Sequence, residues 1–171
     1  DAEMREIFIE EAREVVTDAH AALERLADAP DNAGDMTAVR RAFHTLKGSG
    51  RMVGANEVGD FAWHIETVLN AMLEGSTAAG DDVMLIVRLA DALLPAMKQR
   101  LQQQDSELSG AAIAAVCRQT DRVAAGETAD WSGLDEVLPS AAIGLLNAAT
   151  SSLPQAEAES AGLPEPAVEL T

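Results

Sequence analysis

Hydrophobic and polar positions recur along most of this chain with the period of an α-helix. Apolar residues spaced three and four apart predict helices over residues 1–27, 56–74, 81–104 and 109–126. A further helix is predicted between the first two of these; it is capped by Asp35 or Thr37 and ends near Val53. Turn-forming stretches at residues 29–34 and 75–80 predict short connections. Amphipathic helices joined by short loops pack antiparallel. The pattern predicts an all-α fold, an antiparallel four-helix bundle with an additional C-terminal helix.

The helical pattern weakens after Gly126. Residues 127–150 include Pro139 within a weakly amphipathic stretch, and they predict one or two short helices that dock loosely on the bundle. Residues 151–171 are rich in Pro, Glu, Ala and Ser, which is typical of an extended or partly helical linker. We therefore expect a bundle over residues 1–126, short helices over 127–150, and a linker over 151–171 that tethers the bundle to a following domain.

Composition indicates which side chains fill the core. Hydrophobic residues make up 47% of the 171 residues and aromatic residues only 3%, so Leu, Val, Ile, Met and Ala must supply most of the buried volume. The stripe predicted for residues 1–27 is Met4, Ile7, Phe8, Ala12, Val15, Ala19, Leu23 and Leu26. The stripe predicted for residues 56–74 is Val58, Phe61, Ala62, Ile65, Leu69 and Met72.

Charge and cysteine content exclude several classes of protein. The formal net charge is −17, whereas nucleic acids and anionic membranes are bound by basic surfaces, so we expect neither as a partner. The longest apolar run, residues 83–87, is far shorter than the roughly 20 residues that span a bilayer. Cys117 is the single cysteine, which fits a reducing cytoplasm. The chain starts at Asp1 without an initiator methionine, and we expect it to be a piece of a longer protein.

One predicted helix differs in charge from the rest of the chain. No Asp or Glu occurs from Met36 to Asn56, although the chain has 29 of them, and four of its 12 Lys and Arg residues lie between residues 40 and 51. At about 100° per residue, one side of this helix is apolar and faces the core. The other side gathers the polar residues Arg40, Arg41, His44, Lys47, Gly48 and Arg51. We therefore expect an exposed imidazole, that of His44, among cationic side chains.

This arrangement fits chemistry on a phosphoryl group. An imidazole with an ordinary pKa of about 6.5 is largely neutral near pH 7, so one ring nitrogen can act as a nucleophile. Lys47, Arg40 and Arg51 lie in the same row of the helix, where they can balance phosphoryl charge. Glycine inside a helix costs about 1 kcal/mol relative to alanine. At Gly48 it removes the side chain beside His44, which lets a partner's reactive atom approach.

Other interpretations of the same residues stay open at this point. His44 can be an ordinary exposed histidine, and the arginines and Lys47 can be plain surface charges. A nucleotide-binding loop at residues 48–54 is disfavoured, because no strand precedes it and Lys47 comes before the glycines. A metal site is also disfavoured, because His44 and His64 are 20 residues apart and His44 lacks an acidic or cysteine partner at i+3 or i+4. We expect no cofactor and no metal.

The run of residues 43–55, with His44, Lys47 and Gly48 in that order, resembles the signature of histidine phosphotransfer (HPt) domains. The resemblance covers about residues 1–125 and is nearest to chemotaxis-type hybrid histidine kinases, including multi-HPt kinases of twitching motility. It implies that His44 is phosphorylated, that Lys47 steadies the phosphate and that Gly48 clears the docking face. It also implies that Glu66, on the next helix, bonds the far ring nitrogen of His44. Trp63 occupies a place where such kinases often have a histidine, and His64 is shifted from it by one residue.

The resemblance further implies a function and its partners. The ATP-binding domain of a histidine kinase, in the same or another chain, would phosphorylate His44, and the aspartate of a response-regulator receiver domain, which brings its own magnesium, would remove the group. The sequence shows no ATP site, so the module is not expected to phosphorylate itself, and it fits a fragment of a chemotaxis-type kinase. The alternative is a noncatalytic helical adaptor that binds an acidic partner through the basic face of Arg40, Arg41 and Arg51.

Overall fold

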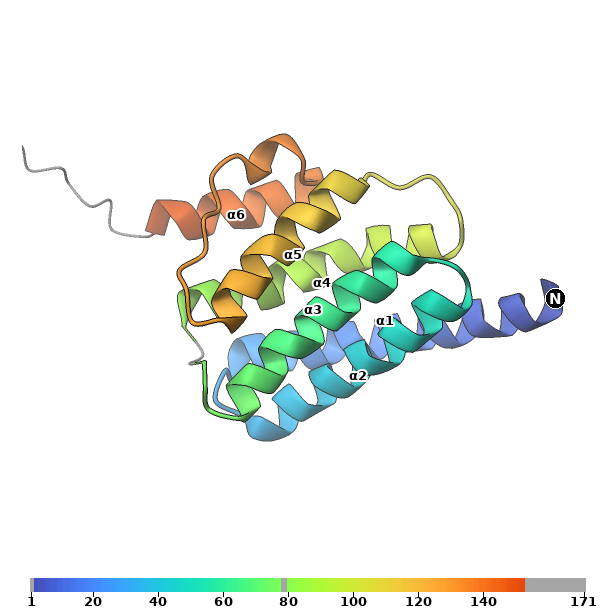
Figure 1. The fold of residues 1–171 in the computed structure, drawn as a ribbon, viewed down its shortest axis with the longest axis horizontal. Helices are drawn as coiled ribbons and strands as arrows, with labels where there is room; N and C mark the ends of the chain where they lie inside the picture. The colour runs from blue at the N-terminus through green and yellow to red at the C-terminus, as the bar shows by residue number, and fades with distance from the viewer. Residues whose placement is uncertain (1, 78–79, 153–171) are drawn as a thin grey trace, which may run out of the picture.

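The structure is a computed structural model that describes residues 2–77 and 80–152. Within these ranges every regular element is helical (Figure 1). The long helices are α1 (Ala2–Asp28), α2 (Ala33–Met52), α3 (Asn56–Leu73), α4 (Asp81–Leu101) and α5 (Gly110–Ala124), followed by a 3-10 turn, η1 (Leu134–Glu136), and by α6 (Ser140–Ser152). The predicted all-α fold is therefore confirmed.

The helices pack in a pattern that follows their short connections. α2 lies against both α1 and α3, α5 lies against α3, and α4 lies against α1 and α6 (Figure 1). Residues 29–32 and 53–55 are too few to carry the chain back along a helix, so α1, α2 and α3 alternate in direction. Within the described residues, no helix combines the length and apolar character that crossing a bilayer requires.

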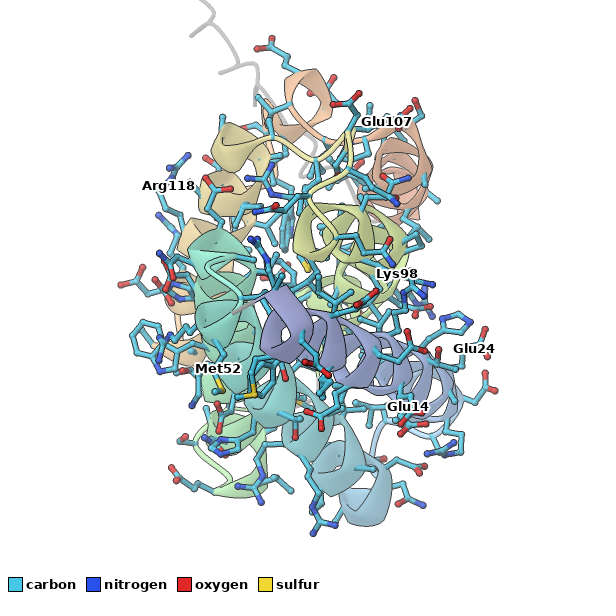
Figure 2. The ribbon with its side chains drawn as sticks, turned by 90° about the vertical axis from the view of Figure 1, so that its right-hand side faces the viewer. Glu14, Glu24, Met52, Lys98, Glu107 and Arg118 are labelled. Carbon is cyan, nitrogen blue, oxygen red and sulfur yellow. The ribbon has the colours of Figure 1, made fainter. Side chains whose placement is uncertain are left out.

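The core follows the predicted stripes on α2 and α3. All six residues predicted for the stripe of residues 56–74 are buried, and Phe43 and Phe61 are the largest fully buried side chains. Acidic side chains cover the outer face of α1, where Figure 2 shows Glu14 and Glu24 pointing away from the bundle. Aliphatic side chains supply most of the remaining core, as the low aromatic content predicts.

Two predictions about helix ends are wrong. Met4 and Ile7 are both 53% exposed, because the first turns of α1 extend past the helices against which the rest of α1 packs (Figure 1). α2 begins earlier than predicted, since the Asn32 side chain accepts a hydrogen bond from the Asp35 nitrogen at 3.0 Å and caps the helix. Thr37 lies inside the helix, where its hydroxyl donates to the Ala33 carbonyl. The predicted cap at Asp1 lies outside the described residues.

The segment after α5 packs against the bundle. Five of its side chains are buried as part of the common core, namely Trp131, Leu134, Leu138, Ala142 and Leu146. Trp131 Nε1 donates to the Asp82 side chain on α4 at 3.0 Å, which fixes the segment to the start of that helix. The predicted linker lies outside the described residues apart from the last two residues of α6, and the division into three units stays a prediction.

Candidate functional site

The contact between α2 and α3 positions the site. A Cβ atom at Gly50 would lie 3.0 Å from the Gly59 nitrogen and 3.2 Å from the Ala55 carbonyl oxygen, and both of these are backbone atoms. Glycines therefore allow the two helices to approach closely near their connection. Further along both helices, this close approach brings the side chains of His44 on α2 and Glu66 on α3 within hydrogen-bonding distance.

His44, Lys47 and Glu66 form one hydrogen-bonded group. His44 Nδ1 lies 2.8 Å from Glu66 Oε1, and Lys47 Nζ donates to Glu66 Oε2 at 2.7 Å. The His44 side chain is 63% exposed, whereas that of Glu66 is only 10% exposed. The pair thus presents the ring to solvent while it holds the carboxylate beneath. This is the contact that the resemblance implies for Glu66.

The carboxylate determines which ring nitrogen carries the proton. Burial is the largest influence on the pKa of Glu66 and raises it, but the hydrogen bonds and charges of Lys47 and His44 together outweigh burial and lower that pKa below its ordinary value. An ionised carboxylate only accepts hydrogen bonds, so Nδ1 of His44 must be the donor. The lone pair of the neutral ring then lies on Nε2, which forms no hydrogen bond within the described part of the chain.

Gly48 leaves open space beside the ring. It is exposed one turn after His44, and a Cβ atom there would meet nothing within 4 Å. Packing within the molecule therefore does not require glycine at this position, in contrast to Gly50.

The basic residues around His44 are not equivalent. Lys47 is bonded to Glu66, and Arg51 lies 3.8 Å from Asp60 on α3. Arg41 is exposed, while Arg40 is partly exposed with its Nε buried and unpartnered within the described residues. Of the four cations around His44, Arg40 and Arg41 therefore form no ion pair in the described part of the chain.

The other two histidines make separate contacts. His64 Nδ1 bonds Asp121 on α5 at 2.5 Å, so His64 does not join the His44 group. His20 on α1 bonds Asp91 on α4 at 2.5 Å and lies 3.3 Å from Glu24. His20, Glu24 and Asp91 are close enough to hold a metal ion. Because both ring nitrogens of His20 already face carboxylates, we interpret this group as a hydrogen-bonded clamp between α1 and α4.

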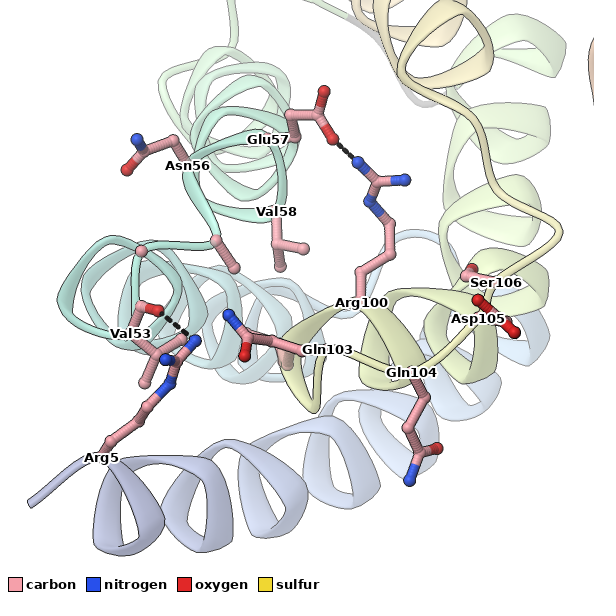
Figure 3. Close-up of a pocket in the computed structure, with 13 residues that line it drawn as sticks. Arg5, Val53, Asn56, Glu57, Val58, Arg100, Gln103, Gln104, Asp105 and Ser106 are labelled. Carbon is pink, nitrogen blue, oxygen red and sulfur yellow. Dashed lines mark hydrogen bonds and ion pairs between the residues drawn. The ribbon is translucent and has the colours of Figure 1, made fainter. Parts of the chain in front are cut away.

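A cavity of about 520 Å³ lies at the end of the bundle near the connection between α2 and α3 (Figure 3). Its two arginines are already engaged, because Arg5 donates to the Val53 carbonyl at 3.2 Å and Arg100 pairs with Glu57. None of the site residues predicted from the sequence lines this cavity. We therefore assign its polar contacts to holding the end of the bundle together.

Sequence reasoning missed two features that shape the site. Gly59 is a second close-approach glycine, and the only available signal was a glycine inside the helix predicted for residues 56–74. The ring contact of Trp63 with His64, with centroids 4.8 Å apart, was also missed. The His64 ring is held by its bond to Asp121, which depends on how α3 is rotated against α5, and periodicity does not specify that rotation.

The fold and the His44 group define a helical phosphotransfer domain, and comparison with known families agrees. The model of the Hpt domain family matches residues 3–107, and the chain belongs to this family. It is a histidine phosphotransfer module of a phosphorelay.

The chain is also similar to proteins named chemotaxis protein CheA. That of Rhizobium meliloti is 29% identical over 167 residues, which cover 96% of this chain and 18% of that protein. That of Borreliella burgdorferi is 32% identical over 82 residues, which cover 48% of this chain and 10% of that protein. That of Halobacterium salinarum is 34% identical over 79 residues, which cover 46% of this chain and 12% of that protein. The chain spans less than a fifth of the length of these relatives. No solved structure matches it.

Proposed function

We propose that His44 is the phosphoacceptor of this module and that Nε2 is the reacting atom. The observation that carries the proposal is the exposed ring whose Nδ1 is bonded to the buried Glu66, which in turn is bonded to Lys47. The carboxylate orients the ring and stabilises the positive charge that develops on it when Nε2 attacks phosphorus. Lys47 and the neighbouring arginines supply positive charge for the phosphoryl oxygens.

The proposed phosphoryl donor is ATP held by the catalytic domain of a histidine kinase. The Nε2 lone pair forms a bond to the γ-phosphorus, the bond from that phosphorus to the bridging oxygen breaks, and ADP leaves with the electron pair. In the second step a carboxylate oxygen of a receiver aspartate forms a bond to the same phosphorus. The Nε2–phosphorus bond then breaks, and the electron pair returns to the ring. The receiver brings the magnesium ion for this step.

We further propose that the module serves a chemotaxis-type pathway in the cytoplasm, because its named relatives are chemotaxis proteins. Within the chain, residues 1–126 would form the phosphotransfer bundle, and residues 151–171 would link it to a further domain. Arg40, Arg41 and Arg51 would face the partner, and Gly48 would give it access to His44.

Labelling of variants at two of the histidines tests the phosphoacceptor. The protein is incubated with a kinase catalytic domain and γ-labelled ATP, and separately with phosphoramidate, which needs no cognate kinase. We expect an acid-labile, alkali-stable label that is lost in His44→Gln and kept in the matched control His20→Gln. Label that survives in His44→Gln would contradict the proposal. Receiver binding that survives in His44→Ala, together with no label on the wild-type protein from either donor, would instead support the noncatalytic adaptor.

A further inference from the structure

Two large apolar side chains are exposed on the helices that carry His44 and Glu66. Among the described residues, the large hydrophobic side chains exposed by more than a third are Met4, Ile7, Met52, Trp63 and Leu73. Met52, at the end of α2, is 64% exposed, and Figure 2 shows it on the molecular surface. Trp63 on α3 is 47% exposed. Exposed apolar side chains such as these gain free energy when a partner buries them.

The helix register places both side chains near Gly48. Met52 is one turn after Gly48 on α2. On α3, Trp63 is one turn before Glu66, which is bonded to His44, and one turn after Gly59, which contacts Gly50. Since α2 and α3 run antiparallel, Trp63 lies beside the turn of α2 that contains Gly48. The open space at Gly48 therefore has an apolar side chain from each helix near it.

Trp63 is held in place before any partner binds. Its ring contacts the His64 ring, with centroids 4.8 Å apart, and His64 is fixed by its hydrogen bond to Asp121 on α5. A side chain that is already ordered loses less conformational entropy on binding. Tryptophan is among the residue types most enriched at the binding hot spots of protein interfaces.

Charge indicates what occupies this surface. Arg40 and Arg41 have no acidic partner in the described part of the chain, and no Asp or Glu occurs between Met36 and Asn56 in a protein of net charge −17. The surface around His44 is thus basic with an apolar edge. A receiver domain that holds magnesium needs several carboxylates around its reacting aspartate, so its docking face is acidic there.

We infer that Trp63, supported by His64 and assisted by Met52, is the apolar anchor by which a receiver domain docks on this module and a determinant of which receivers are served. The inference rests on the proposed function, because it concerns the partner of the same site. Trp63 acts through binding: it holds the receiver domain against the module and takes no part in bond making.

Phosphotransfer kinetics test the inference. Phosphorylated wild type is mixed with each receiver domain of the source cell, and transfer is measured against receiver concentration for those that take the label. We expect Trp63→Ala to raise KM by about tenfold or more, with the rate at saturation unchanged within about twofold. Met52→Ala should raise KM several-fold and Trp63→Phe less than Trp63→Ala. Met84→Ala, the same substitution at a half-buried position on α4, should leave KM unchanged.

Two further readouts separate the possible failures. Labelling of His44 by phosphoramidate should be equal in Trp63→Ala and wild type, and in a Trp131→Phe background the emission of Trp63 should shift when receiver is added. Transfer with an unchanged KM in Trp63→Ala would overturn the anchor and leave the phosphoacceptor proposal intact. A lower saturating rate with slower phosphoramidate labelling would show that Trp63 only supports the structure. Absence of any label on wild type would overturn the proposed function itself.

Discussion

At the scale of single residues, the proposed chemistry of the module depends on a carboxylate that is both buried and ionised. Glu66 meets this condition because two donors, Lys47 and His44, outweigh the effect of burial on its pKa. The same carboxylate fixes the proton on Nδ1 of His44 and thereby frees Nε2. Lys47 thus has a role toward Glu66 even before a phosphoryl group arrives.

Replacement of Glu66 by glutamine should slow the reaction of His44. The amide keeps the shape of the side chain but loses the charge that stabilises the reacting ring, so labelling by phosphoramidate should slow roughly ten- to a hundredfold. The ¹⁵N shifts of the ring should show a larger share of the tautomer protonated on Nε2. Glu74→Gln, at the end of the same helix, is the control and should label at the wild-type rate. Equal rates in Glu66→Gln and wild type would remove Glu66 from the site.

The sequence indicated which residues belong to the candidate site but not all of their contacts. His44, Lys47 and Gly48 stand on one helix, so helical spacing alone placed them on one face. Glu66 lies on a different helix and was indicated only by the resemblance. The pairing of Lys47 with Glu66, and of Arg51 with Asp60, depends on the distance and rotation between α2 and α3. Periodicity specifies neither quantity.

At the scale of elements, two glycines of α2 have opposite structural settings. Gly50 meets backbone atoms of α3, which cannot move aside cheaply, whereas Gly48 faces open space. Gly50→Ala should lower the free energy of unfolding by about 1–3 kcal/mol through overpacking. Gly48→Ala should raise it by up to about 1 kcal/mol through helix propensity while it slows transfer to a receiver. Urea unfolding measures both, and destabilisation by Gly48→Ala would contradict this account.

The contact between α1 and α4 should depend on pH. The hydrogen bond and charge of Asp91, aided by Glu24 and opposed by desolvation, raise the pKa of His20 above its ordinary value. A histidine whose pKa is raised in the folded state stabilises that state. This stabilisation is fully present below the unfolded-state pKa of about 6.5, and it is lost as pH rises through the folded-state pKa.

His20→Gln should therefore destabilise the protein more at pH 5.5 than at pH 9. Because the pair is exposed, the difference should be at most about 1 kcal/mol. The free energies of unfolding of wild type and variant, measured at both pH values, test this directly. A loss that is the same at both pH values would show that the charge of His20 is not involved.

At the scale of the whole molecule, the segment after α5 contributes to the core of the bundle. Trp131, Leu134 and Leu146 are buried, and Asp82 accepts hydrogen bonds from both Trp131 Nε1 and the Ala129 nitrogen. A segment that shares the core should unfold together with it. Periodicity alone did not predict this, because a weakly amphipathic stretch has the same pattern whether it packs on a bundle or stays apart.

Trp131→Ala should lower the free energy of unfolding by about 3 kcal/mol, because it leaves a cavity and deprives Asp82 of a donor. In a Trp63→Phe background, the fluorescence of Trp131 should follow the same urea transition as the helical circular dichroism. A separate, earlier fluorescence transition would show that residues 127–150 form a unit of their own. The matched substitution Trp63→Ala, at an exposed site, should cost far less stability.

The sequence by itself determined the helices, their order and the side of α2 that faces water, because these follow from local periodicity and short connections. It also determined the charge contrast around His44, because an acid-free stretch in an acidic chain is a property of composition. Only the tertiary structure decided the close approach at Gly50 and Gly59, the partner of Lys47 and the bond of His64 to Asp121. These depend on how the helices are spaced and rotated against one another, which packing of the whole core sets.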